Sequence, residues 1–525
     1  MLETEHKHRK ILTKENTADM NGNAYIMVVL GILLAKGLGF YRDMVFAGVF
    51  GTGTGADIYF QVFGLVNLIF TGIGVALSTL VIKNINQSHN VGREKAYAAD
   101  FIKKSMLYLL AAIALIAVCA KPIVKVILPE ISGKDFDLAV RLMYIMLPSL
   151  MFVVVAYIIS GILQNEKVYF VTSVMSLPFN AAIILSLNIP GVSIETVGAV
   201  TTLGWFLHIL ILIPSFIKKG YGLKSDKHST RNKAGSSTEI LWIFISNMMF
   251  QICFYADRAF VSGDAGMAST FNYASNLFIT ISSVFVVAMS TVVFPAISKN
   301  YEEGNKDYVN ELLRYIITVM VAIFGPFLMV AGLFGEDVIR LVYERGSFTS
   351  ESTKAVASMF FIYSLGILGY VCQELFNKIL YLAGKYKYTV IGTIAVIGAN
   401  LIINLAIRFL DVSSSGSFYT STPGLIGIST SVLLTLYAVA IAIGIRKVIG
   451  PYWKKSLIKD LIKIGISLAL AFTVYVAFKL AMPEFTHGYV TFIVAIGACA
   501  VVYIAALYFT GMIKRLLKRE TKGEQ

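Results

Sequence analysis

The sequence predicts an all-α polytopic membrane protein with about 14 transmembrane helices. Of its 525 residues, 57% are hydrophobic and only 14% are charged, whereas soluble proteins carry about 25% charged residues. A soluble chain of this length would need more charge to cover its cores, so the composition argues against a soluble enzyme, a disordered scaffold or a nucleic-acid binder. The apolar residues also form continuous runs, which are too long for the strands of a membrane barrel.

The individual spans follow from the thickness of the membrane. A helix rises about 1.5 Å per residue and the hydrocarbon layer is about 30 Å thick, so each span needs about 20 mostly apolar residues. The sequence contains fourteen such runs: 24–50, 57–83, 105–128, 139–163, 168–189, 194–217, 240–262, 268–297, 309–335, 355–384, 388–410, 424–446, 460–482 and 488–513.

The charges between the spans predict the topology. Basic residues concentrate in both tails and in every second connection, and the connection at 218–239 is the most basic. The alternate connections at 51–55, 188–193, 262–266 and 412–424 contain no Lys or Arg, whereas the connection near 336–354 departs from this alternation. Because cytoplasmic loops are enriched in Lys and Arg, we expect both termini to be cytoplasmic. The net charge of +14 then reflects topology rather than a nucleic-acid partner.

An internal repeat relates the two halves of the chain. FYRDMVFAGVFGTGTGADIYF at 40–60 resembles FYADRAFVSGDAGMASTFNYA at 254–274, and VALSTLVI at 75–82 resembles VAMSTVVF at 287–294. Each half of the chain begins with a span of the same predicted orientation, which indicates parallel repeats of the kind found in transporters. The expected organisation is a tail at 1–23, six-helix lobes at 24–217 and 240–446 joined by the linker 218–239, two extra helices within 460–513, and a tail at 514–525.

The first span carries charge inside the membrane, where charge is costly and usually functional. It holds two cations, Lys36 and Arg42, and one acid, Asp43. These groups could neutralise one another as internal salt bridges, but one positive charge would remain. A site for an anionic head group explains that surplus.

Polar side chains recur at helical spacing on the second and eighth spans. Small and polar residues on one helix face can serve close packing alone, or they can line a cavity that binds sugars or peptides. Their occurrence in both repeats favours the cavity. The stripes are Gln61, Gly64, Thr71, Gly74 and Ser78, and Asn272, Asn276, Thr280, Ser283 and Ser290.

The chain lacks the sequence signs of an enzyme. No HExxH, Walker A or GxSxG motif stands in a suitable context, and the six histidines are scattered. A membrane glycosyltransferase or acyltransferase would need catalytic carboxylates or His on a sizeable loop, and the longest loops are short and basic. We therefore expect a transporter that has no catalytic residues.

The stretch AKGLGFYRDMVFAGVFGTGTGADIYFQVFGLVN at 35–67 resembles the start of the lipid II flippase family MurJ, within the multidrug/oligosaccharidyl-lipid/polysaccharide exporter superfamily. The resemblance continues through DRAF at 257–260, FPAISKNYEEGN at 294–305 and VYERGSFT at 342–349. It implies fourteen helices, a central cavity that opens to either side, and a groove for a polyprenyl tail formed with the last two helices.

The resemblance also places charged residues. Lys36 stands where the family has an arginine, and Arg42, Asp43 and Asp57 fall on charged positions of the family. The sequence departs from the family at a pair of arginines, replaced by Phe70 and Thr71, and at an arginine of the eighth helix, replaced by Asn276. The expected substrate-binding residues are Lys36, Arg42, Asp43, Asp57, Thr71, Ser78, Asn276 and Ser283.

The expected function is a flippase of the bacterial plasma membrane that moves a lipid-linked cell-wall precursor, lipid II first, from the inner to the outer leaflet by alternating access. The partners would be a precursor with a diphosphate head group and membrane lipids, with no nucleic acid. The departures from the family leave another undecaprenyl-linked saccharide as an alternative. A cation-coupled small-molecule exporter of the same superfamily is a further one.

The energy source is a separate question, because the chain has no ATP-binding motif. We expect no organic cofactor, and either Na⁺ or the membrane potential as the driver. The candidate Na⁺ ligands are Asp257 on the seventh span and Asn400 and Asn404 on the eleventh, which together offer one negative charge and neutral oxygens. The alternative is that Asp257 pairs with Arg258 or another cation while the asparagines bond between helices.

Overall fold

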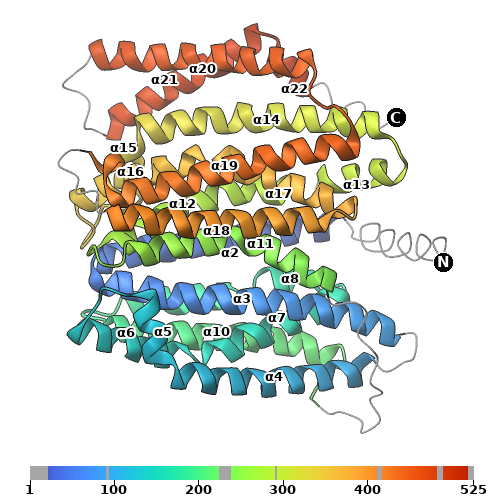
Figure 1. The fold of residues 1–525 in the computed structure, drawn as a ribbon, viewed down its shortest axis with the longest axis vertical. Coiled ribbons are helices and arrows are strands. Elements are labelled where there is room, and N and C mark those ends of the chain that lie inside the picture. The colour runs from blue at the N-terminus through green and yellow to red at the C-terminus, as the bar shows by residue number, and fades with distance from the viewer. Residues whose placement is uncertain are drawn as a thin grey trace. The chain divides into compact units, whose positions relative to one another are not determined.

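The computed structural model describes residues 22–89, 94–223, 238–289, 293–410, 417–481 and 489–517. Within these ranges every regular element is a helix and no strand is present, as Figure 1 shows. The all-α prediction is confirmed. Three predicted segments, the tail at 1–23, the linker 218–239 and the tail at 514–525, lie largely outside the described residues, and so does Ser290 of the second polar stripe.

Each predicted span coincides with one helix or with two consecutive helices. The single helices are α2 (Gly22–Phe50), α3 (Thr54–His89), α10 (Ile194–Lys218), α11 (Thr238–Phe260), α12 (Met267–Ala288), α14 (Lys306–Leu333), α18 (Tyr386–Leu410), α19 (Thr422–Ile449), α20 (Lys455–Ala481) and α21 (Tyr489–Phe509). The paired helices are α4 and α5 (Glu94–Val118, Ala120–Ile127), α6 and α7 (Gly133–Met146, Ser149–Asn165), α8 and α9 (Tyr169–Ser173, Leu177–Leu187) and α16 and α17 (Ser350–Leu365, Ile367–Leu382). Short helices α13 (Phe294–Glu302), α15 (Gly335–Tyr343) and α22 (Met512–Leu517) adjoin the spans.

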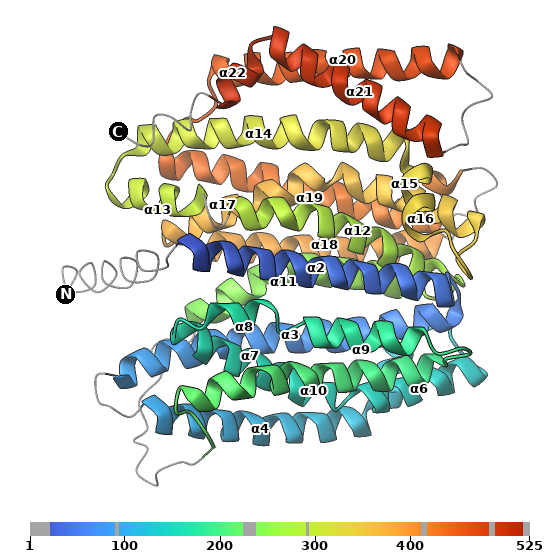
Figure 2. The same cartoon turned by 180° about the vertical axis from the view of Figure 1, so that it is seen from behind.

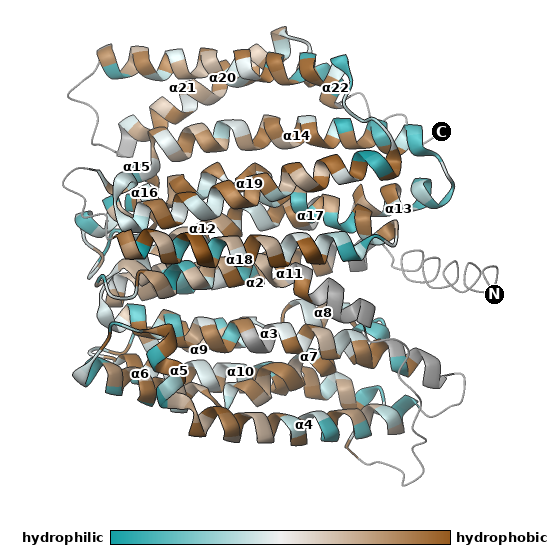
Figure 3. Ribbon diagram, in the orientation of Figure 1, coloured by the Kyte–Doolittle hydropathy of each residue, from teal (hydrophilic) through white to brown (hydrophobic). Residues whose placement is uncertain are grey.

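Length and apolar composition identify most of these helices as membrane spans. Ten helical segments among the described residues are long and apolar enough to cross a bilayer, and the pair α16 and α17, bent by 42°, makes eleven. Helices α2, α11 and α12 fall outside this count, although they coincide with the first, seventh and eighth predicted spans. The count is consistent with fourteen spans. Figure 3 shows hydrophobic residues along α4 and α14 and hydrophilic ones toward one end of each.

The chain divides into two compact units. Unit 1 comprises residues 1–45, 69–121 and 140–235, and unit 2 comprises 46–68, 122–139 and 236–525. The ends of α2 and α3 that adjoin residues 51–53 therefore belong to unit 2, together with the segment around α5. The predicted lobe boundaries remain a prediction.

Unit 1 is assembled around α10, which packs against α7 and α9; Figure 2 shows α9 and α10 side by side. Small residues allow these helices to approach closely. A Cβ at Gly204 would lie 2.7 Å from the Phe179 ring, and a Cβ at Gly198 would lie 2.7 Å from Leu142. Gly198 and Gly204 thus leave room for large side chains of the neighbouring helices in the core of unit 1.

Unit 2 is built from pairs of packed helices, most of which are not consecutive in the sequence. Helix α11 packs on α18, α12 on α16, α17 on α19, and α20 on α21. A Cβ at Gly369 of α17 would lie 2.8 Å from the backbone of Thr435 on α19, so only glycine permits that contact. The cation candidates on α11 and α18 are brought together by the first of these pairs.

Candidate functional site

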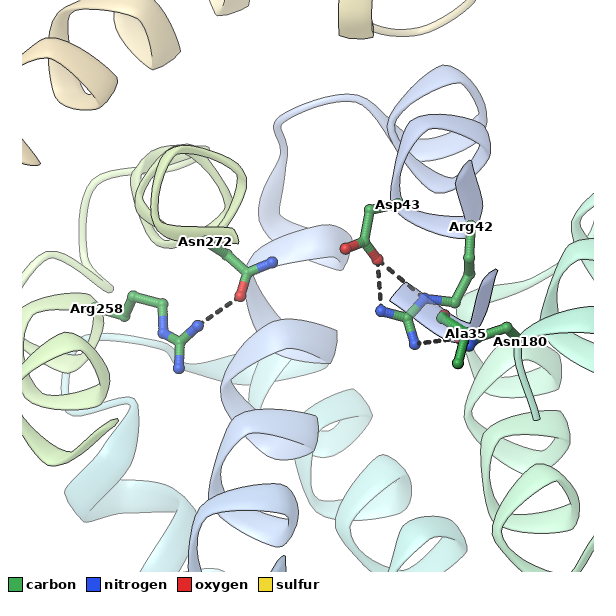
Figure 4. A network of polar contacts seen from close by, with 6 residues as sticks. All are labelled: Ala35, Arg42, Asp43, Asn180, Arg258 and Asn272. Atoms are coloured by element: carbon green, nitrogen blue, oxygen red, sulfur yellow. Dashed lines mark hydrogen bonds and ion pairs between the residues drawn. The ribbon is translucent and has the colours of Figure 1, made fainter. Parts of the chain in front are cut away.

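The charged residues of α2 form a hydrogen-bonded group in unit 1. Arg42 donates from Nε and Nη2 to Oδ1 of Asp43, at 2.9 and 2.6 Å, and from Nη1 to Oδ1 of Asn180 on α9, at 3.1 Å. Asn180 in turn donates to the carbonyl of Ala35, as Figure 4 shows. Lys36 is partly buried on the same helix. The salt bridge foreseen as the alternative does form, and the group retains one net positive charge.

The guanidinium of Arg42 is also held from its face. It lies 5.5 Å from the centre of the Phe179 ring, a distance at which cation–π attraction operates. Arg42 and Asp43 keep 18% and 10% of their side-chain surface exposed. The arginine is therefore oriented by three neighbours and is still accessible to a ligand.

Replacing Gly39 with leucine should lower transport about tenfold, the effect expected from overpacking by 1–3 kcal/mol. A Cβ at Gly39 would lie 3.6 Å from the Asn180 amide, so a larger side chain displaces the residue that holds Arg42. Gly37 is the matched control, because a Cβ there meets nothing within 4 Å. Transport and cysteine accessibility from both sides would be measured. Equal effects of Gly37→Leu and Gly39→Leu would show that helix stiffness, not crowding, is responsible.

Asp57 lies in unit 2 and binds a helix end. Its Oδ2 accepts from the amide of Gly266 and its Oδ1 from the amide of Ser269, both at 2.6 Å. Gly266 is the N-cap of α12 and has φ +84°, a conformation that favours glycine. A carboxylate at this end of a helix satisfies free amides and complements the helix dipole. With 1% exposure, Asp57 has the surroundings of a structural cap rather than of a ligand contact.

Asp57→Ala should lower the free energy of unfolding by about 1–3 kcal/mol, because two buried amides lose their acceptor. The matched control is Ser193→Ala, which removes the exposed hydroxyl that accepts a hydrogen bond from the Thr196 amide at the start of α10. This change should lower the free energy of unfolding by about 1 kcal/mol or less. Thermal unfolding of the purified variants in detergent measures both. A drop for Asp57→Ala no larger than for Ser193→Ala would contradict the capping role.

Asp257 of α11 is the centre of a fully buried polar cluster in unit 2. Its Oδ1 accepts from Asn404 at 2.8 Å and from Asn400 at 3.3 Å. Thr430 of α19 lies 2.8 and 2.7 Å from the two carboxylate oxygens, and Tyr363 of α16 donates to Oδ2 at 3.0 Å. The structure thus brings together the three predicted residues and adds two hydroxyls.

In this structure both amides turn N–H groups toward Asp257, and Oδ1 of Asn404 accepts from Ser429, so a cation would require the amides to turn. Carboxylate, amide and hydroxyl oxygens are the ligands that hard monovalent cations prefer. Oδ1 of Asn400 is buried with no hydrogen-bond partner among the described residues, and a half-turn of its amide would present that oxygen to Asp257. The hydrogen-bond partners of Asp257 named above are neutral, but Arg258, the next residue, interacts with the carboxylate electrostatically, and a buried carboxylate needs such compensation.

Arg258 does not pair with Asp257 within the described residues. Its Nη1 donates to Asn272 of α12, its guanidinium lies 5.7 Å from the Tyr255 ring, and its Nε is buried without a hydrogen-bond partner. Figure 4 shows the hydrogen bond from Arg258 to Asn272. Asn272 is one turn before Asn276 on α12. The positively charged side chain of Arg258, on α11, therefore lies beside the polar stripe of α12.

The remaining predicted residues lie on α3 and α12. Ser78 is so close to α7 that a Cβ at Gly161 would lie 2.1 Å from its Oγ, which is the geometry of close helix packing. Ser283 donates to the carbonyl of Thr280, and Asn276 is partly exposed. Thr71 is in α3, but its side chain lies outside the described residues. For these positions substrate binding stays a prediction.

Three residues of these clusters escaped the sequence analysis. Thr430 and Tyr363 stand among other hydroxyl residues of their spans, and hydroxyls in membrane helices commonly bond to their own backbone. Asn180 is one of several polar residues in its span. Their polar side chains within membrane spans could have marked these residues as candidates, but nothing in the sequence indicates that they bind Asp257 or Arg42.

Comparison with known proteins gives consistent matches at the level of sequence. The family described as "Lipid II flippase MurJ" matches residues 46–508. The "Lipid II flippase MurJ" of Thermosipho africanus is 24% identical over 507 residues, which cover 95% of this chain and 98% of that protein. The "Probable lipid II flippase MurJ" of Rhizobium tropici is 24% identical over 367 residues, covering 66% of this chain and 68% of that one.

Solved structures share the fold. A "Lipid II flippase MurJ, inward closed conformation" superimposes with a TM-score of 0.77 at 21% identity and covers 93% of this chain and 99% of that chain. An inward-facing multidrug resistance MATE family transporter of the MOP superfamily gives a TM-score of 0.60 at 18% identity, with 82% and 99% coverage. At these identities the structures establish the fold alone.

Proposed function

The chain belongs to the lipid II flippase MurJ family, and from this premise we propose that it moves a lipid-linked cell-wall precursor, lipid II first, from the inner to the outer leaflet of the bacterial plasma membrane. The family match over residues 46–508 is the observation that carries the proposal. The family is one of transporters, so no catalytic residues are required. The chain is a multi-pass membrane protein, and the loop charges favour cytoplasmic termini.

Arg42 is the residue that binds the diphosphate of the precursor. The side chain of Arg42 is 18% exposed, and its guanidinium has five N–H groups, so it can donate to phosphate oxygens beside its bonds to Asp43 and Asn180; charge-assisted hydrogen bonds are strong where water is scarce. Asp43, Asn180 and Phe179 fix its orientation in advance, which lowers the entropy that binding would otherwise cost. Lys36 contributes a second positive charge on the same helix.

Arg258 is a second anion-binding candidate, carried by unit 2. Asn276 stands where the family has an arginine in the eighth helix, so this position lacks a positive charge. Arg258 places a positive charge beside the same polar stripe of α12, because it donates a hydrogen bond to Asn272. Its unpartnered Nε keeps donor capacity for a substrate. This supports a lipid diphosphate as the substrate class in spite of the departure from the family.

Coupling to Na⁺ through Asp257 is the energy source that the geometry favours. Asp257, Asn400, Asn404 and Thr430 would hold the ion by their oxygens once the two amides turn, and the ion would add a positive charge to that of Arg258, which already interacts electrostatically with Asp257. The membrane potential is the alternative driver, worth about 2.3 kcal/mol per charge per 100 mV. Neither driver requires a nucleotide.

Two alternatives remain for the cargo. Another undecaprenyl-linked saccharide would use the same diphosphate contacts, and the absence of the paired arginines at Phe70 and Thr71 favours it. A cation-coupled exporter of small molecules shares the fold, but a net positive charge on α2 disfavours cationic drugs. Depletion of the protein in growing cells tests the proposal: lipid-linked precursors should accumulate in the inner leaflet, and an unchanged distribution would contradict it.

A further inference from the structure

A cavity of about 600 Å³ lies in unit 2 where α14, α20 and α22 meet. Two contacts fix its walls: Tyr315 of α14 donates to the carbonyl of Leu516 at 2.9 Å, and Arg515 of α22 forms an ion pair with Asp460 of α20. Both contacts hold the short helix α22 against the span helices. The hydrogen bond of Tyr315 and the ion pair of Arg515 therefore fix the positions of residues that bound the cavity.

The charges around this cavity leave positive charge for a ligand. Arg314, Lys514 and Arg515 line it together with the acids Glu311 and Asp460, so the lining carries one net positive charge. Asp460 is engaged by Arg515. The Nη1 atom of Arg314 is buried and has no hydrogen-bond partner among the described residues. A buried donor of this kind is costly unless a ligand or water accepts from it.

The surroundings of the cavity point to a lipid as the source of the anion. Trp453, which is exposed just before α20, has the position of an aromatic anchor at the membrane surface. Ile458, Ile462 and Ile466 form an exposed apolar stripe on α20 at a spacing of four residues. Residues two apart on a helix lie about 200° apart, so this stripe is on the opposite face of α20 from the cavity-lining Asp460. Helix α20 therefore offers apolar surface to lipid on one face and lines the cavity with the other.

We propose that this cavity binds the phosphate of an anionic phospholipid, with Arg314 and Lys514 as its cationic ligands. Basic pockets between membrane helices on the cytoplasmic side bind anionic lipid head groups, and loop charge places this end of α14 and α20 there. The bound lipid is a resident of the bilayer. The inference is independent of the transported precursor, because none of these residues belongs to the clusters around Arg42 or Asp257.

Titration of the purified full-length protein with dioleoylphosphatidylglycerol in detergent, followed by native mass spectrometry, tests the site. Lys514→Ala should weaken binding about fivefold, and Arg314→Gln combined with Lys514→Ala about 20-fold or more, the losses expected when one and two charged contacts disappear. Lys514 is exposed, so the single variant should fold as the parent does. Lys459→Ala, which removes an exposed cation of α20 outside the cavity lining, is the matched control and should change binding less than twofold.

Further arms separate the possible sources of the anion. Dioleoylphosphatidylcholine should bind equally to the parent and to both variants. Inorganic phosphate should displace the phosphatidylglycerol only at far higher concentration. Unchanged binding by the double variant, or an equal loss with Lys459→Ala, would overturn the site. Displacement of the lipid by inorganic phosphate at a similar concentration would overturn the assignment to a phospholipid.

Discussion

Arg42→Ala should reduce flipping of the lipid-linked precursor by about 100-fold or more, because each lost charge-assisted contact to a phosphate is worth about 1.5–3 kcal/mol. The substitution removes the donor at the centre of the group formed with Asp43 and Asn180. It also leaves Asp43 as an uncompensated carboxylate, which repels the diphosphate. Flipping would be measured with the variant inserted at the level of the parent.

Two further variants make this result specific. Arg42→Lys should retain part of the activity, because lysine keeps the charge but loses the planar fork of donors. Arg141→Ala removes an exposed arginine of unit 1 whose partner is Glu195, and it should leave flipping unchanged. Normal flipping by Arg42→Ala would exclude Arg42 from phosphate binding.

Asp257→Asn should abolish the dependence of flipping on a Na⁺ gradient. The substitution keeps the size of the side chain and removes the negative charge that attracts the cation. In proteoliposomes, an inward or outward Na⁺ gradient should change the rate of the parent several-fold, since about 1.4 kcal/mol of driving force corresponds to a factor of ten. The variant should respond to neither gradient.

Asp135→Asn is the control for the cation experiment, because Asp135 is an exposed acid in the first turn of α6. Its Na⁺ response should equal that of the parent. A parent whose rate ignores Na⁺ but follows an imposed potential would show that voltage drives transport. In that case the cluster around Asp257 would have a structural role only.

Much of the fold could be predicted from the sequence because the bilayer imposes a simple rule on it. Apolar runs of about 20 residues must become helices, since no other element satisfies the backbone in lipid. The breaks inside the runs could not be seen this way. Helix α7 follows Pro148, and Gly366 is the C-cap of α16; each break depends on which neighbour packs there.

The candidate sites were predictable to different degrees for physical reasons. Asp257, Asn400 and Asn404 stand out because polar groups in apolar spans must find one another, and the structure brings them together. The cap that Asp57 forms on α12 could not be predicted, because its partners are backbone amides that no residue type marks. Arg258 was considered only as a partner of Asp257, since its contact with Asn272 depends on how α11 and α12 pack.

The central claim is that the protein flips a lipid-linked precursor, and transport of purified lipid II in proteoliposomes tests it most directly. Fluorescent lipid II incorporated in both leaflets, with an impermeant quencher added outside, reports how fast the inner pool becomes accessible. The parent should expose that pool much faster than protein-free vesicles, and Arg42→Ala should not. Equal rates for the parent and protein-free vesicles would contradict lipid II transport, and faster exposure of an undecaprenyl-linked saccharide in the same assay would identify that lipid as the cargo.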